Sequence, residues 1–327
     1  MRKVFGIAVR KGGQGKSTTV STVGRLCALY GARVLVVDLA QPGTTTSSLR
    51  DIWPESEHGE LSRVMVSFQM EPSGTVPDVM VAREALAAAM LPVVLRSQPS
   101  WNGGRVLVLP WDELQGDAAA FLHSERVLEG LLGALEQEFD LALIDYPGES
   151  GPLLTNALMA TTDVVIPVVT ETPALEGVES MLRLMARVRE AGHALDLAGV
   201  LLTRCDPRNR RAFEIVQTIL QAGEVEGESL GRKLLPFAIR QNEFFEQAFR
   251  YGEPIWERSS NPAHWAGYVL FTEWLLRKAG LMHLATARRG PALLGPDVRI
   301  LSTSGLLVDD PDVPLSNFET AHSTLGG

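Results

Sequence analysis

A lysine- and glycine-rich segment near the N-terminus has the residue types and the spacing that bind a polyphosphate. Residues 10–18 read RKGGQGKST, directly after an apolar run and directly before a helical pattern. Glycines permit a tight turn whose backbone N–H groups point at phosphate oxygens, and the following helix presents the positive end of its dipole. The segment therefore predicts a phosphate-binding loop. The predicted nucleotide-binding residues of this loop are Lys11, Gly12, Gly13, Gln14, Gly15, Lys16, Ser17 and Thr18.

Side chains at the end of this loop have distinct expected roles. Lys16 is placed to neutralise the β- and γ-phosphates, and Thr18 is placed to contact the α-phosphate. Ser17 offers a hydroxyl to Mg²⁺, an ion that keeps most of its waters and takes few protein ligands. The loop departs from the ordinary Walker pattern, because Arg10 stands at the position of the first glycine and a second lysine, Lys11, follows it.

The elements that position this loop alternate between strand and helix. Short β-branched, apolar runs recur along the chain, and helix-like stretches separate most of them. Such alternation predicts right-handed βαβ crossovers and an α/β protein with a doubly wound, mostly parallel sheet flanked by helices, in which ligands bind at the carboxyl ends of the strands. The predicted strands are residues 4–9, 33–39, 105–109, 141–145, 163–169 and 197–203, and the predicted helices are residues 17–30, 125–136, 174–190 and 211–221.

The organisation along the chain predicts one main domain. We expect this domain to span residues 1–279, with a variable helical insertion at 51–104. Residues 280–327 have scattered Pro and Gly and no sustained period, which predicts a loosely ordered tail.

Composition narrows the function classes. No stretch approaches the roughly 18 apolar residues of a membrane-spanning helix, and the N-terminus runs directly into a predicted strand, so a cytoplasmic protein without a membrane partner is expected. Cys27 and Cys205 are far apart and form no CxxC pattern, which favours buried thiols over a disulfide framework or a metal site. The net charge of −9 requires that any nucleic-acid surface be local.

The loop resembles a known family. Its KGGxGK[ST] pattern is similar to the deviant Walker A motif of the ParA/MinD superfamily, in which the extra lysine, matched here by Lys11, reaches across a sandwich dimer to the partner's nucleotide. Asp38 matches the Walker A′ aspartate, and Asp145 in LALIDYPGES matches the Walker B aspartate that holds magnesium through water. The likeness covers residues 3–278, includes GVLLTRCDPRN and AFRYGEPI, and is closer to ParA than to MinD.

The resemblance implies a P-loop NTPase fold and an ATPase that uses ATP and Mg²⁺. It assigns catalytic roles to Lys11, Lys16 and Asp38. It places Ser17, Asp38 and Asp145 at the metal. It further implies a homodimer in the ATP state that binds DNA non-specifically, is discharged by a ParB-like or other adaptor protein, and partitions a plasmid, a chromosome or another cargo.

One departure from the family concerns catalysis. ParA-like proteins usually carry a second aspartate two positions after the Walker A′ aspartate, and it helps to position the attacking water; here that position is Ala40. Because water positioning is a large part of NTPase catalysis, hydrolysis to ADP and phosphate is expected to be slow or to need a partner. Two alternatives stay open: Gln41 substitutes, or the loop is shifted by one residue and another side chain positions the water.

A second departure concerns DNA. The family uses an arginine in a D-x-R motif after the LLT strand, which Arg208 matches, and Arg210 and Arg211 follow at the start of a helix. The second arginine of the family's DNA face is replaced by Phe244. Arginines can hold phosphates through charge-assisted bonds, so we predict a DNA-binding role for Arg208, Arg210 and Arg211.

Adenine contacts are expected from two segments that the family uses. These are the end of the LLT strand, with Thr203 and Arg204, and the loop at 239–241. Arg240 replaces the usual proline of that loop and can stack on the base.

Rival interpretations make different demands on the sequence. A MinD-like membrane positioner needs a basic amphipathic C-terminal helix, a metallocluster ATPase needs paired cysteines, and a tyrosine autokinase needs a tyrosine-rich tail; the sequence has none of these. The main alternative is a non-hydrolysing, ATP-locked dimer that acts as a scaffold or a DNA-coating switch, because Ala40 removes the water-positioning group.

Overall fold

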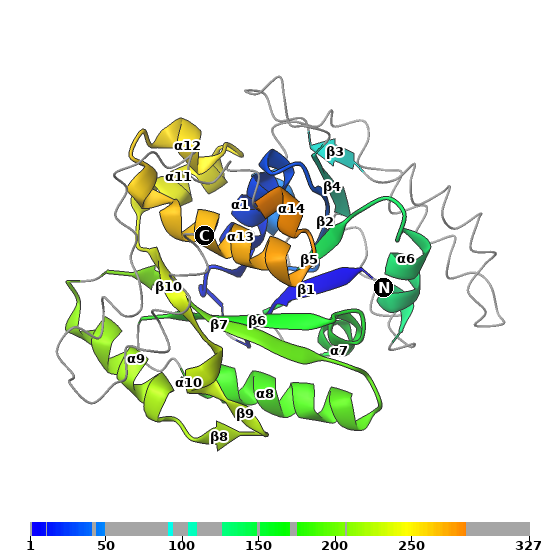
Figure 1. The fold of residues 1–327 in the computed structure, drawn as a ribbon, viewed down its shortest axis with the longest axis vertical. Helices are drawn as coiled ribbons and strands as arrows, with labels where there is room; N and C mark the ends of the chain where they lie inside the picture. Colours follow the sequence, from blue (N-terminus) through cyan, green and yellow to red (C-terminus); the bar gives the residue numbers. More distant parts are fainter. Residues whose placement is uncertain are drawn as a thin grey trace.

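The computed structural model of the protein describes residues 2–10, 12–40, 44–49, 91–93, 104–109, 126–148, 151–170, 175–206 and 208–285. These residues form an eight-stranded sheet in the order β10-β7-β6-β1-β5-β2-β4-β3 (Figure 1), in which only β3 runs antiparallel to its neighbour. The strands are β1 (Lys3–Ile7), β2 (Arg33–Asp38), β3 (Leu91–Val93), β4 (Arg105–Leu109), β5 (Leu141–Asp145), β6 (Asp163–Val169), β7 (Asp196–Cys205) and β10 (Leu234–Arg240). A separate two-stranded ribbon pairs β8 (Glu224–Val225) with β9 (Glu228–Ser229).

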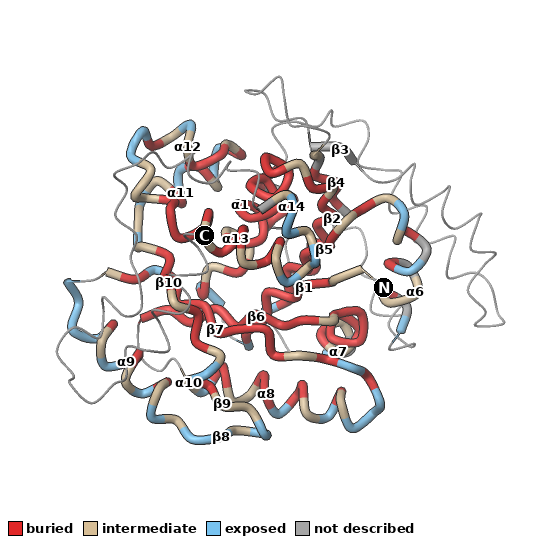
Figure 2. Tube along the Cα trace, in the orientation of Figure 1, coloured by how far each residue is buried: buried red, intermediate tan, exposed pale blue. Residues whose placement is uncertain are grey.

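Helices cover both faces of the sheet, and Figure 2 shows the buried strands between them. The described helices are α1 (Lys16–Leu29), α2 (Thr44–Ser48), α6 (Val127–Ala134), α7 (Pro152–Met159), α8 (Leu175–Glu190), α9 (Arg210–Gln221), α10 (Leu230–Lys233), α11 (Glu243–Arg250), α12 (Ile255–Arg258), the 3₁₀ helix η3 (Pro262–His264), α13 (Ala266–Lys278) and α14 (Met282–Ala285).

Two apolar cores explain why the strands read as continuous hydrophobic runs. Along β5, Leu141 and Leu143 pack into the core shared with α1 and α13, whereas Ala142 and Ile144 pack into the core shared with α6 to α10. Successive side chains of a strand point to opposite faces, so a strand covered on both faces must be apolar at every position. Both β1 and α1 pack in these cores, so the loop that joins them is held at both of its ends.

The predicted doubly wound, mostly parallel sheet is confirmed, and the differences lie at its edges. The edge strands β10 and β3 were not predicted from the sequence. Within the expected helical insertion at 51–104, the structure describes Leu91–Val93 as a strand and Gly104 as coil, and the remaining residues lie outside the described ranges. Within the expected tail, α14 continues the fold and Leu281 and Leu284 pack on the α1 core, while residues after 285 lie outside the described ranges.

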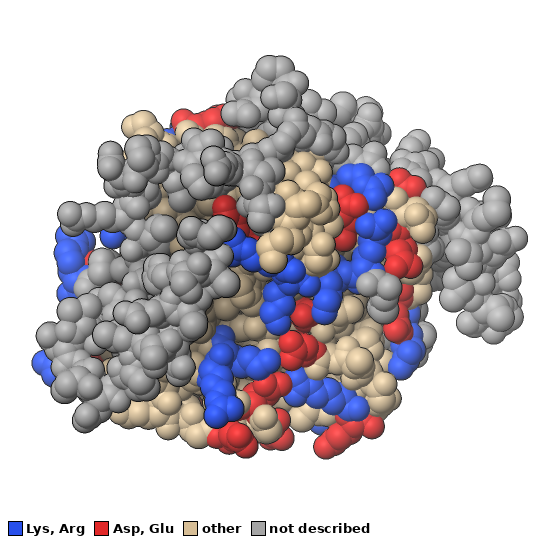
Figure 3. All heavy atoms as spheres, viewed as in Figure 1, with Lys and Arg blue, Asp and Glu red and all other residues tan. Residues whose placement is uncertain are grey.

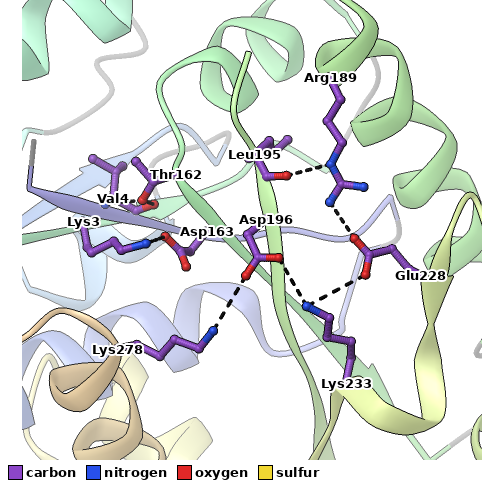
Figure 4. A network of polar contacts seen from close by, with 10 residues as sticks. All are labelled: Lys3, Val4, Thr162, Asp163, Arg189, Leu195, Asp196, Glu228, Lys233 and Lys278. Carbon is purple, nitrogen blue, oxygen red and sulfur yellow. Dashed lines mark hydrogen bonds and ion pairs between the residues drawn. The ribbon is translucent and has the colours of Figure 1, made fainter. Parts of the chain in front are cut away.

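Ion pairs at the amino edge of the sheet join two strands to each other and a third strand to helices α10 and α13. The first residues of β1 and β6 are ion-paired, with Lys3 Nζ 2.7 Å from Asp163 Oδ2, and Asp196 at the start of β7 contacts Lys233 at 3.2 Å and Lys278 at 3.7 Å (Figure 4). Positive and negative side chains are interspersed over the face shown in Figure 3. Partly exposed pairs of this kind contribute about 0–1 kcal/mol each. These ion pairs lie at the amino ends of the strands, whereas the phosphate-binding loop follows the carboxyl end of β1.

Among the described residues, no helix has both the length and the apolar character needed to cross a membrane. Both predicted buried thiols, Cys27 and Cys205, are buried and unpaired.

Candidate nucleotide and magnesium site

The predicted phosphate-binding loop lies between the carboxyl end of β1 and the start of α1. Gly13 and Gly15 have φ values of 73° and 78°, in the left-handed region that side-chain-bearing residues avoid. Gly15 is also the N-cap of α1 and supplies no side-chain hydrogen bond to the first turn. Backbone donors at the start of such a helix form a ready site for an anion. The local sequence therefore builds the loop that its pattern predicts.

Gln14 and Thr203 brace this loop against the sheet. The Gln14 side chain accepts a hydrogen bond from Val169 N at 3.2 Å and donates to the Gly12 carbonyl at 3.4 Å. Thr203 Oγ1 donates to the Gln14 carbonyl at 3.1 Å. Thr203, which the resemblance places near adenine, thus also ties the loop to the end of β7.

The two predicted carboxylates lie side by side beneath the loop. Asp38 and Asp145 end β2 and β5, are partners in the parallel register, and are fully buried. Burial, followed by the charge of Asp38, raises the pKa of Asp145 to about 7, although hydrogen bonds from Ser17 and Thr45 oppose that rise. Burial likewise raises the pKa of Asp38, against hydrogen bonds that include those from Thr46 and Ala40.

This carboxylate pair suits a divalent cation. Asp145 Oδ1 is buried and has no hydrogen-bond partner among the residues that the structure describes. Leaving a charged acceptor unpaired is costly, and a hard cation with its waters satisfies such oxygens. Ser17, Asp38 and Asp145 are therefore the residues that would hold Mg²⁺, and their assignment to the metal stays a prediction.

Lys16 lies in the same buried cluster. Its side chain is 8 % exposed, and burial lowers its pKa while the charge of Asp145 raises it. A phosphate group supplies the additional negative charge that stabilises an ammonium in this environment. The position of Lys16 supports its predicted contact with the β- and γ-phosphates.

Helix α2 approaches both carboxylates, which sequence reasoning missed. Thr46 N donates to Asp38 Oδ2 at 2.6 Å, and Thr45 Oγ1 donates to Asp145 Oδ2 at 2.7 Å. Ala40 N donates to the other Asp38 oxygen at 3.1 Å. The only signal was the run of small hydroxyl residues TTTSS at 44–48, close after Asp38.

One cavity of about 520 Å³ joins the loop to the predicted base-contacting residues. Its volume is typical of a small-molecule site. The predicted residues that line it are Gly12, Gly13, Gln14, Gly15, Lys16, Ser17, Thr18, Thr203, Arg204 and Arg240. Lining residues that were not predicted as ligand contacts include Ala40, Tyr146, Asn242, Phe245, Phe249 and Tyr268. Lys11 lies outside the described residues, so its predicted role stays a prediction.

The base end of the cavity combines aromatic rings with buried donors. Phe245 and Tyr268 are in edge-to-face contact, with ring centroids 5.1 Å apart. Arg240 Nε and Asn242 Nδ2 are buried without hydrogen-bond partners among the described residues. Arg204 has a φ of 51°, a strained backbone conformation for a residue other than glycine. Apolar walls with a few convergent donors are the usual character of a small-molecule site, and the adenine contacts stay a prediction.

Tyr146 fixes the chain just after Asp145. Its ring packs so closely on Gly6 of β1 that a Cβ atom at Gly6 would lie 2.5 Å from the ring carbon Cε2. The Tyr146 hydroxyl also hydrogen bonds to Thr161. This close packing explains the glycine within an otherwise apolar strand.

The predicted DNA-binding arginines lie outside the cavity. Arg208 makes two hydrogen bonds of 3.1 Å to Asp206, and Arg210 at the start of α9 lies 3.4 Å from Glu214. Their side chains are 89 % and 92 % exposed. Phe244, which stands where the family has its second arginine, stacks on His264 with ring centroids 5.2 Å apart. The chain thus has one arginine cluster at the start of α9, and an aromatic pair stands where the family has its second arginine.

The fold, the loop and the paired carboxylates define a P-loop nucleoside triphosphatase. The model of a family described as an AAA domain matches residues 2–197. The chromosome-partitioning ATPase Soj of Thermus thermophilus is 32 % identical over 254 residues, which cover 76 % of this chain and 85 % of Soj. The sporulation initiation inhibitor protein Soj of Bacillus subtilis is 27 % identical over 256 residues, which cover 78 % of this chain and 90 % of that protein. The chain belongs to the ParA/MinD superfamily of P-loop ATPases, in the partition branch.

A solved structure shares the fold and was determined with a nucleotide and magnesium bound. Cobyrinic acid a,c-diamide synthase from Mycobacterium smegmatis, solved with a bound ATP analog and magnesium, has a TM-score of 0.62 and 26 % sequence identity. The match covers 85 % of this chain and 95 % of that one.

Proposed function

We propose that this protein is a ParA-like ATPase that binds Mg·ATP, forms a nucleotide sandwich homodimer, and binds DNA non-specifically to partition a cargo. The observation that carries the proposal is one cavity lined by the glycine loop, Lys16 and the predicted adenine-contacting residues, together with the two buried carboxylates at the ends of β2 and β5. The relatives named above support the partition role, and a ParB-like or other adaptor would discharge the dimer. A cytoplasmic location, on the nucleoid where DNA is bound, belongs to the same proposal.

The proposal gives each group a task. The loop amides and Lys16 bind the phosphates and hold them at the N-terminus of α1. Asp38, Asp145 and Ser17 would hold magnesium, whose positive charge would offset the negative charge of the phosphates. At Ala40 the backbone N–H is already bonded to Asp38, and the methyl group can neither accept nor orient a proton. The chain therefore has the residues that bind Mg·ATP but lacks, at position 40, the carboxylate that would align the attacking water.

Replacement of Lys11 by alanine tests the sandwich dimer. We expect Lys11→Ala to bind ATP and to stay monomeric, because the proposed partner of this lysine is the nucleotide across the interface. Multi-angle light scattering with Mg·ATP measures the mass. Arg10→Ala is the matched control, since Arg10 is an adjacent cation that bonds to Ser180 in its own subunit, and it should dimerise normally. A Lys11→Ala protein that dimerises like the wild type would contradict the sandwich.

DNA binding is expected to depend on the cluster at the start of α9. Arg208→Glu with Arg211→Glu should weaken ATP-dependent binding at least about tenfold and flatten its salt dependence, because fewer counterions are released from DNA phosphates. The bonds from Arg208 to Asp206 do not prevent this, since an exposed pair is weak in water.

The measurement is a mobility shift on DNA of unrelated sequences at several salt concentrations. Arg183→Glu with Arg187→Glu makes the same charge change on the exposed side of α8 and should leave binding nearly unchanged. Equal losses in both double variants would show that net charge, and not this cluster, governs binding.

A second candidate function is favoured by Ala40. An ATP-locked dimer that acts as a scaffold or as a DNA-coating switch needs the intact binding residues and no turnover. Phosphate release measured with Mg·ATP, DNA and cell extract separates the two functions, since partner-stimulated release is expected only of the partition ATPase.

A further inference from the structure

Thr45 on helix α2 contacts Asp145, one of the two carboxylates assigned to magnesium. Its side chain is fully buried, and its hydroxyl donates a 2.7 Å hydrogen bond to Asp145 Oδ2. The two residues are 100 positions apart in the chain, so the bond joins the segment after β2 to the end of β5. The phosphate-binding role of the loop does not account for this contact.

The hydroxyl has a choice of acceptor, and the geometry shows which one it takes. The Ser17 carbonyl lies 3.3 Å from Thr45 Oγ1, compared with 2.7 Å for the carboxylate. A hydroxyl has one proton to donate, and a charged acceptor at the shorter distance binds it more strongly. The Thr45 proton is therefore directed at Asp145.

The two oxygens of Asp145 consequently differ. Oδ2 is occupied by Thr45, whereas Oδ1 is buried with no hydrogen-bond partner within the described ranges. A carboxylate held through one oxygen presents the other in a fixed direction. Groups that hydrogen bond to metal-ligating carboxylates in this way change metal affinity by about 10- to 100-fold when they are removed.

The placement of α2 makes this bond a rigid one. Thr46 N is bonded to Asp38, and Ser48, on the next turn of α2, accepts a 3.1 Å hydrogen bond from the Arg25 guanidinium through its carbonyl. Arg25 is itself buried in α1. Thr45 is thus held from both sides while it contacts the carboxylate.

We propose that Thr45 is a positioning residue for magnesium, which holds Asp145 through Oδ2 so that Oδ1 faces the ion. The proposal rests on the assignment of Asp145 to the metal site made above. It predicts that removal of the Thr45 hydroxyl reduces the gain in ATP affinity that magnesium provides. ATP affinity measured without metal should not depend on this hydroxyl.

The test is the ratio of ATP affinities measured by calorimetry in saturating Mg²⁺ and in EDTA. Thr45→Val keeps the shape and removes the hydroxyl, Thr45→Ser keeps the hydroxyl, and both are compared with the wild type after their folding has been verified by circular dichroism. Ser48→Ala is the matched control, because Ser48 Oγ donates to the Thr45 carbonyl within α2 at 2.7 Å and makes no hydrogen bond to either carboxylate among the described residues.

We expect Thr45→Val to reduce the magnesium-dependent gain about tenfold and to change the affinity in EDTA by less than about twofold. Thr45→Ser and Ser48→Ala should retain the gain. An unchanged gain in folded Thr45→Val, or equal losses with and without metal, would overturn the positioning role. Asp145→Asn separates the positioning role of Thr45 from the metal-site assignment of Asp145. If Asp145→Asn keeps the full magnesium-dependent gain, the metal-site assignment itself fails. If Asp145→Asn loses the gain while Thr45→Val retains it, only the role of Thr45 is rejected.

Discussion

Lys16→Ala is expected to weaken ATP binding by at least about 100-fold. Lys16 is 8 % exposed and lines the cavity, and its burial lowers its pKa. Truncation of one member of a buried, hydrogen-bonded charge pair costs about 2–5 kcal/mol, since the remaining charge loses its partner. Without the ammonium, the loop amides and the proposed magnesium would be the remaining partners of the phosphates in the same subunit.

Isothermal calorimetry with Mg·ATP measures this loss directly. Lys278→Ala is a suitable control, because Lys278 pairs with Asp196 at the opposite edge of the sheet and its removal should leave ATP affinity within about twofold of the wild type. Near-normal affinity in Lys16→Ala would contradict the phosphate-binding assignment, whatever the behaviour of the control.

The central strands were predictable because their burial imposes a local signal. In β2, β5 and β6 nearly every residue is buried, so a run of apolar residues marks each strand without reference to its neighbours. β10 gave a weaker signal, since charged residues precede its run and Arg240 ends it. Pro236 and Arg240 of this edge strand are only partly buried, whereas every residue of the central strands β5 and β6 is buried.

The glycine loop was also predictable, because its residues are contiguous and its positive φ values require glycine at fixed positions. Contacts that stabilise the site from a distance gave no comparable signal. Gln14 bonds to Val169, 155 positions away, and Thr45 bonds to Asp145. Helix α2, with the sequence TTTSS, has no apolar period, and the structure shows that its backbone and hydroxyl groups bind buried carboxylates. Such contacts are set by the fold, so a single sequence cannot show them.

Restoring the carboxylate at Ala40 is expected to accelerate ATP hydrolysis by about tenfold or more. Ala40 lines the cavity, and its backbone N–H donates a hydrogen bond to Asp38. Loss of one orienting group in a preorganised site commonly costs on the order of 100-fold in rate, so part of that factor should return. The missing group acts on the aligned water, so its restoration should raise kcat and leave ATP affinity nearly unchanged.

Single-turnover phosphate release with saturating Mg·ATP measures the rate of this step for Ala40→Asp. Ala40→Asn matches the aspartate in size but lacks its charge and basicity, and it should give a smaller gain. Comparable gains from both variants would show that filled volume, and not a carboxylate, limits the rate. An unchanged rate in Ala40→Asp with normal ATP affinity would show that another group, such as Gln41 or a side chain of a partner protein, already positions the water. In that case the substitution at residue 40 would not be the cause of slow turnover.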